Sequence, residues 1–131
     1  MKPVDQTIFG YPNGNCFAAC VASILEIPIE DTPSIEGKKF ESAWDVWFNE
    51  RGLTFVDVPA GNGAYIQGFC IATGKSPRGG LTASGRPVLH AVVAQNMALV
   101  HDPHPGRAFL DGSPIEFTVI CPLDWAAWQR R

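Results

Sequence analysis

The abrupt change from a turn to a helix near Asn15 constrains the fold of this chain more than any other stretch. The segment 11–15 is rich in turn-forming residues. An apolar pattern with helical spacing follows at once, at Phe17, Val21, Ile24 and Leu25. We expect a helix over about 15–26, with Asn15 or Asn13 as its N-cap. Cys16 then lies in the first helical turn.

The position of Cys16 at a helix start indicates a nucleophile. Free amides and the helix dipole favour a negative charge there, which predicts a lowered thiol pKa. The same amides can stabilise the oxyanion that forms when a carbonyl is attacked. The alternative is structural, because a cysteine that begins a core helix commonly serves as a small apolar residue. Cys20, one turn further along, is expected in the core.

Length and composition predict a single globular domain over residues 1–131. A chain of 131 residues can bury a core of its own, and 46% hydrophobic with 18% charged residues is typical of globular proteins. The net charge of −3 and the lack of basic clusters argue against nucleic acid as a partner. No apolar run is long enough to span a bilayer, so we expect no membrane association. Without the apolar core of a signal peptide, the expected location is cytoplasmic.

The cysteines are expected to be reduced thiols. A cytoplasmic protein rarely keeps disulfides, and the spacing lacks the paired pattern of a zinc site. The residues concerned are Cys16, Cys20, Cys70 and Cys121. We expect no metal and no other cofactor.

The remaining pattern predicts a second helix followed by strands. Trp44, Trp47 and Phe48 fall on one face of a helix over about 42–51, and Gly52 suits the left-handed position after it. The two tryptophans suit either a ligand groove or the core, and we favour the core. Strands are expected at 53–58, 65–73, 87–94, 98–101 and 115–121, and the segment 125–128 is expected to pack as a tail.

The segment from Pro87 to His101 predicts a β-hairpin with Asn96 at its tip. In that register Ala94 faces Ala98, and His90 faces Asp102. Opposed residues of paired strands project to the same side, so a histidine and a carboxylate are expected side by side.

A metal site is a second interpretation of the histidines. His90, His101, Asp102 and His104 are all residue types that bind zinc. The alternation of a strand, however, places His101 on the face opposite His90 and Asp102. We therefore favour a histidine–carboxylate pair without metal.

A thiol at a helix start, a histidine and an acid together suit nucleophilic catalysis. The order Cys16, His90, Asp102 resembles the papain-like cysteine peptidase superfamily, and most closely the leader-peptidase domains of bacteriocin exporters. The resemblance is carried by Asn15-Cys16, by His90-Ala-Val-Val93 and by Asp102-Pro103. The chain is also similar to short phage and bacterial proteins with a GNCF…ACVAS start and an HDPHP segment.

The resemblance implies an α+β papain-like fold, with the cysteine helix packed on a small antiparallel sheet that bears His90 and Asp102. It implies a thiol hydrolase acting on a peptide, isopeptide or other amide bond through a thioester. Cys16 would attack, His90 would transfer the proton and Asp102 would orient His90. The oxyanion glutamine of the family normally lies closer to the cysteine, where this chain has Gly10. Gln6 takes that role only if the intervening loop folds back.

A glycine-rich loop over 74–80 carries Lys75 and Arg78. It suits either the rim of a substrate groove, favouring an acidic or carboxylate-bearing partner, or a solvated connection. The expected partner is a peptide or protein substrate. Hydrolysis, deamidation and acyl transfer share this chemistry, and the oligomeric state stays open. The rival class is a catalytically inactive papain-like binding or adaptor protein, possible because one fold hosts many functions.

Overall fold

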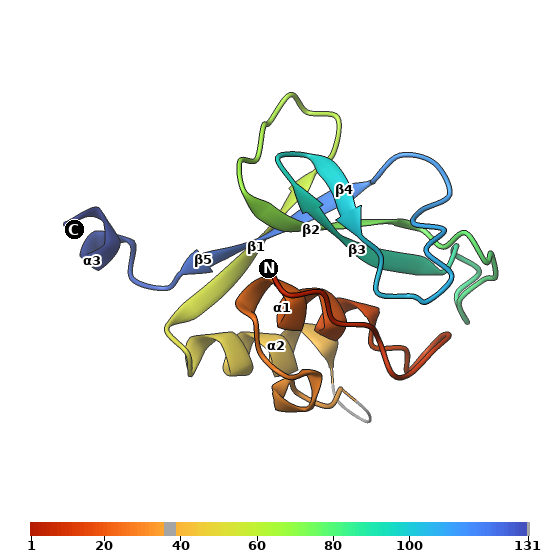
Figure 1. Ribbon diagram of the computed structural model, residues 1–131, viewed down its shortest axis with the longest axis horizontal. Helices are drawn as coiled ribbons and strands as arrows, with labels where there is room; N and C mark the ends of the chain where they lie inside the picture. Colours follow the sequence, from red (N-terminus) through yellow and green to blue (C-terminus); the bar gives the residue numbers. More distant parts are fainter. Residues whose placement is uncertain (36–38, 131) are drawn as a thin grey trace.

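The computed structural model describes residues 1–35 and 39–130. These residues form an α+β fold, as expected (Figure 1). The helices are α1 (Cys16–Leu25), α2 (Phe40–Asn49) and α3 (Trp125–Gln129), with a 3-10 turn η1 at Ile29–Asp31. The strands are β1 (Leu53–Pro59), β2 (Phe69–Lys75), β3 (Leu89–Gln95), β4 (Ala98–His101) and β5 (Glu116–Pro122). In the described part of the chain, no helix has the length and apolarity needed to cross a membrane.

The strands form one antiparallel sheet in the order β1-β5-β2-β3-β4. Helix α1 packs against β3 and β2, and α2 packs against β1. Both helices therefore cover the same face of the sheet (Figure 1). The expected arrangement of a cysteine-bearing helix on a small antiparallel sheet is confirmed.

The core has two parts because the centre of the sheet is buried on both faces. On the helix side, Trp44, Trp47 and Phe48 are buried with Ile71 and Val93, which confirms the core assignment of these aromatic residues. The other face buries a smaller apolar cluster, consisting of Cys70, Ala72, Val92, Ala94 and Phe117. Loop residues, among them Phe109 and Leu110, pack over that second face.

The start of α1 differs from the expectation in its capping. Asn15 occupies the N-cap position but makes no side-chain hydrogen bond to the first turn. Its Oδ1 accepts instead from the amides of Thr7 and Ile8, each at 2.9 Å, and its Nδ2 donates to the Thr7 hydroxyl at 2.9 Å. The predicted cap is therefore wrong, because the extended N-terminal arm supplies competing amides. The Asn15 side chain therefore makes no hydrogen bond to the first turn of α1.

Replacing Asn15 by alanine is expected to lower the free energy of unfolding by about 1–2 kcal/mol, because three hydrogen bonds to the arm are lost. Denaturant unfolding measures the change. Asn13→Ala is the matched control, since Asn13 is exposed and its side chain makes no hydrogen bond to the described residues. Equal stability of the two variants would contradict the role of Asn15 as a clamp on the arm.

The hairpin forms, but its register is not the predicted one. Asn96 and Met97 make a two-residue turn with φ of 51° and 72°, so Ala98 pairs with Gln95 and not with Ala94. A bulge after Val93 then shifts the register again, and Val93 pairs with His101. The predicted pairing of His90 with Asp102 across the two strands is therefore wrong. Strand β4 ends at His101, and Asp102 follows it.

Strand β2 and the C-terminal segment also differ from the prediction. Strand β2 begins at Phe69 and not at Tyr65, directly after Gly68, whose φ of 87° breaks the extended conformation. The C-terminal segment forms α3 at the far end of β5 (Figure 1). Trp125 and Trp128 stay 48% and 46% exposed and contact each other edge to face, so this tail lies at the surface.

Candidate active site

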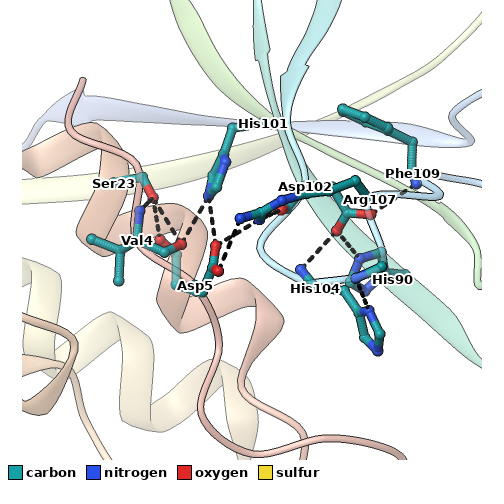
Figure 2. A network of polar contacts seen from close by, with 11 residues as sticks. Val4, Asp5, Ser23, His90, His101, Asp102, His104, Arg107 and Phe109 are labelled. Atoms are coloured by element: carbon teal, nitrogen blue, oxygen red, sulfur yellow. Dashed lines mark hydrogen bonds and ion pairs between the residues drawn. The ribbon is translucent and has the colours of Figure 1, made fainter.

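Asp102 is the polar centre of the site. Its side chain is 0% exposed and lies directly after β4. Oδ1 of Asp102 lies 2.7 Å from Nε2 of His90 and accepts from the amide of His104 at 2.9 Å. Oδ2 accepts from the amide of Phe109 at 2.8 Å (Figure 2). The predicted contact between His90 and Asp102 is thus present, although the loop after β4 makes it and not the predicted strand register.

The surroundings of the pair fix its protonation. Burial alone would raise the pKa of Asp102, but hydrogen bonds from His90, His104 and Phe109 outweigh it and lower the pKa. Burial lowers the pKa of His90 by more than its hydrogen bond to Asp102 raises it. The stable form is therefore a carboxylate beside a neutral imidazole. Since a carboxylate only accepts, we assign the imidazole proton to Nε2. Nδ1 makes no hydrogen bond to the described residues and is left as the basic nitrogen.

The hydrogen-bonded pair makes the stability of the fold sensitive to acid. Unfolded His90 takes up a proton near pH 6.5, whereas the folded residue does so only at lower pH. The unfolded state thus binds more protons in this interval, so the free energy of unfolding is expected to fall as the pH drops from about 7 to 5. The lowered pKa of Asp102 continues the fall below about pH 4. Denaturant unfolding at several pH values should show a smaller slope above pH 5 in His90→Gln. Identical slopes would contradict this protonation assignment.

Cys16 shares two hollows with His90. It is the first residue of α1 and is half-buried. Burial raises the pKa of the thiol by more than hydrogen bonds from the backbone amides of Ala91, Phe17 and Cys16, together with the charge of Arg78, lower it. The predicted lowering of the pKa is therefore wrong. The helix start favours a thiolate as expected, but the packing of α1 on β3 removes water from the sulfur.

The larger hollow, which we call the cationic groove, has a volume of about 1150 Å³. It brings together all the predicted site residues except Asp102. Its lining includes Gln6, Cys16, Lys75, Arg78 and His90. Lys75, Ser76, Arg78, Gly79 and Gly80 of the segment 74–80 line the groove, and Gly74 and Lys75 belong to the end of β2.

Gln6 reaches the groove because the loop before Cys16 folds back. The amide of Asn15 donates to the carbonyl of Ile8 at 3.1 Å, which closes the loop. The side chain of Gln6 is only 6% exposed, and its Nε2 donates to the carbonyl of Ile8 at 2.9 Å. The Oε1 atom is buried without a hydrogen-bond partner among the described residues. The loop between Gln6 and Cys16 thus folds back, which is the condition stated above for an oxyanion role of Gln6.

A polar network ties the N-terminal arm to the loop after β4, and the sequence pattern did not indicate it. Arg107 makes two hydrogen bonds to the carboxylate of Asp5, at 2.6 and 2.9 Å, and also donates to the carbonyl of Asp102 (Figure 2). Nε2 of His101 lies 2.9 Å from the carbonyl of Val4. The amide of Gln6 donates to the carbonyl of Pro103 at 3.0 Å. The arm that carries Gln6 therefore also holds the segment that carries Asp102.

The described residues give no support to the metal-site interpretation of the histidines. In residues 1–35 and 39–130, no group of three or more His, Cys, Asp or Glu side chains is placed to hold a metal ion. His101 contacts the arm, as described, on the side of the sheet that Val93 faces. All four cysteines are free thiols.

The groove thus combines a half-buried thiol, a neutral imidazole held by a buried carboxylate, and a buried glutamine. This set can accept a proton from a thiol and can surround a carbonyl group with donors. No protein-family model, curated protein or solved structure matches the chain, and the geometry of this groove is the basis for its proposed function.

Proposed function

We propose that this protein is a papain-like thiol hydrolase that cleaves a peptide, isopeptide or other amide bond. The observation that carries the proposal is the 2.7 Å contact between buried Asp102 and His90, since His90 lines the same groove as Cys16. The geometry suits a nucleophile, a base and an orienting acid. The order of these residues and the α+β fold with an antiparallel sheet suit the papain-like superfamily.

The reaction begins with a protonated thiol. Nδ1 of His90 accepts the proton while the sulfur of Cys16 adds to the carbonyl carbon. The tetrahedral intermediate then collapses, the C–N bond breaks, and the amine leaves with the proton from His90. A water molecule attacks the resulting thioester with His90 as base, which releases a carboxylic acid and restores the thiol. Asp102 holds the imidazole in the tautomer that this sequence needs.

Donors for the oxyanion come from two places. The backbone amide of Cys16 lies in the first turn of α1, where helical amides lack intrahelical acceptors. Nε2 of Gln6 uses one hydrogen for the carbonyl of Ile8 and keeps a second one for the substrate. The carbonyl of Ile8 also fixes the orientation of the Gln6 amide, with nitrogen on the side of that bond.

A binding or adaptor protein on the same scaffold, of bacterial or phage origin, is the second candidate. The raised pKa of Cys16 favours it, because a buried, protonated thiol is what a structural cysteine would show. The two candidates predict different rates of Cys16 modification by a ketone reagent that resembles a substrate. An active site binds the carbonyl next to the sulfur, whereas a structural thiol only excludes the bulkier reagent.

We therefore compare the rates at which N-acetylglycine chloromethyl ketone and iodoacetamide modify Cys16, and we measure the same two rates for glutathione. The ratio of the ketone rate to the iodoacetamide rate is expected to be at least about tenfold higher for Cys16 than for glutathione, because the groove holds donors for the ketone oxygen. Peptide mass mapping identifies the modified residue. Cys20, Cys70 and Cys121 are buried and serve as internal controls that stay unmodified in the folded protein. A ratio equal to or below that of glutathione would favour the adaptor over the hydrolase.

A further inference from the structure

Two hollows adjoin Cys16 and His90. Besides the cationic groove, a smaller hollow of about 290 Å³, which we call the acidic pocket, is also lined by Cys16, Leu89 and His90. A bound substrate whose carbonyl carbon lies at the sulfur of Cys16 therefore has space on both sides of the reacting bond. The charges of the two hollows are opposite.

The cationic groove carries Lys75, Arg78 and Arg86. Among the described residues that line it there is no aspartate or glutamate. None of the three cations makes an ion pair within the described part of the chain. Arg78 lies close enough to Cys16 for its charge to lower the pKa of the thiol, although burial outweighs it. Carboxylates of a substrate would find three cations here that make no ion pair within the described residues, and the charge of one of them, Arg78, acts on the Cys16 thiol.

The acidic pocket carries Glu41, Asp57 and Glu116, and no lysine or arginine is among its described lining residues. Glu116 pairs with Thr73 in the sheet, and Thr73 pairs with Ala91, which belongs to the helix-side core. Paired residues project to the same side, so Glu116 faces the helices, where a strand residue is normally apolar.

Asp57 lies on the same side of the sheet as Glu116. It pairs with Thr118 in the sheet and accepts a hydrogen bond from the Thr118 hydroxyl at 2.6 Å. Burial, and then the charge of Asp57, raise the pKa of Glu116. Two like charges partly removed from water are unfavourable unless a cation joins them.

Gln6 indicates independently that the groove is built for a ligand. Its side chain is only 6% exposed, and its Oε1 accepts no hydrogen bond from the described residues. A buried acceptor without a partner is costly in a folded protein. An N–H of a substrate main chain bound in the groove would supply the missing donor.

We propose that the substrate is an extended peptide or isopeptide with carboxylate side chains on one side of the cleaved amide bond and a lysine or arginine on the other. This inference rests on the proposed function, because it places the cleaved bond at Cys16. The carboxylates bind in the cationic groove, and the basic side chain binds in the acidic pocket. Water supplies the atoms for hydrolysis as described above, and no further reactant is needed.

Binding of uncleaved peptides tests the inference without requiring turnover. The full chain with Cys16→Ala is titrated with fluorescent peptides of matched length: acidic half before lysine, lysine before acidic half, all acidic, all basic, and neutral. One of the two mixed peptides is expected to bind at least about tenfold more tightly than the neutral peptide, and more tightly than the all-acidic one. The advantage should shrink at high salt. An all-acidic or neutral peptide that binds as tightly as both mixed peptides would overturn the inference.

Charge-neutral variants assign each half of the peptide. In the Cys16→Ala background, Glu116→Gln is expected to remove the gain from lysine and keep the gain from the acidic half, and Arg78→Gln is expected to do the reverse. Glu50→Gln and Arg130→Gln, both exposed and outside the two hollows, are the matched controls. Equal effects of Glu116→Gln and Glu50→Gln would overturn the acidic half of the inference. The two proposals can fail separately. If the protein prefers a mixed peptide but Cys16 forms no thioester, the charge recognition is supported and the proposed hydrolysis is contradicted.

Discussion

Replacing Asp102 by asparagine is expected to lower the free energy of unfolding by about 2–4 kcal/mol, because hydrogen bonds to a buried carboxylate are weakened and a buried donor is left unpaired. The side chain of Asp102 is fully buried and accepts hydrogen bonds from His90, His104 and Phe109. Asparagine keeps the shape but turns one acceptor oxygen into a donor group. At least one N–H in this buried cluster would then point at another donor.

Denaturant unfolding at neutral pH measures this loss. Asp111→Asn is the matched control, because Asp111 is exposed and its side chain makes no hydrogen bond to the described residues. A loss below about 1 kcal/mol for Asp102→Asn, the range of an ordinary neutral hydrogen bond, would show that Asp102 does not stabilise this part of the fold as a buried carboxylate.

Replacing His90 by glutamine is expected to slow acyl transfer from N-acetylglycine p-nitrophenyl ester by about 10²–10⁴-fold, the usual contribution of a positioned base. Because burial raises the pKa of Cys16, the thiol is protonated at neutral pH and depends on His90 to remove its proton. Glutamine retains a donor for Asp102, so the variant tests the base more than the fold. Release of p-nitrophenol measures the rate.

The matched control for this variant is His101→Gln. His101 is also a buried histidine, and Nε2 of His101 lies 2.9 Å from the carbonyl of Val4, yet it is not among the described residues that line the groove. We expect this variant to keep the acyl-transfer rate within a few-fold of the parent. Equal losses in both variants would assign the effect to the fold and not to proton transfer.

The parts of the fold that depend on local patterns were predictable from the sequence. The apolar spacing after Asn15 defines α1 within one residue at each end, and Trp44, Trp47 and Phe48 define the buried face of α2. The local patterns also placed Cys16 at a helix start and His90 in a strand.

The parts that depend on tertiary contacts were not predictable. The bulge after Val93 changes the hairpin register, and no glycine or proline in the sequence indicates it. Asp102 still reaches His90 because Asp102 lies in the loop beyond β4. Asn15 had two possible sets of amides to bind, and only the folded arm decides between them. The sign of the pKa shift of Cys16 depends on how deeply α1 packs on β3.

The central claim is that Cys16 attacks a carbonyl group and forms a thioester with the help of His90. Intact mass and peptide mapping after brief reaction with N-acetylglycine p-nitrophenyl ester test it most directly. The predicted result is one acetylglycyl group on the peptide that contains Cys16, formed rapidly, lost on further incubation, and strongly diminished in His90→Gln. Acylation that is absent from Cys16, or that is unchanged by His90→Gln, would contradict the claim.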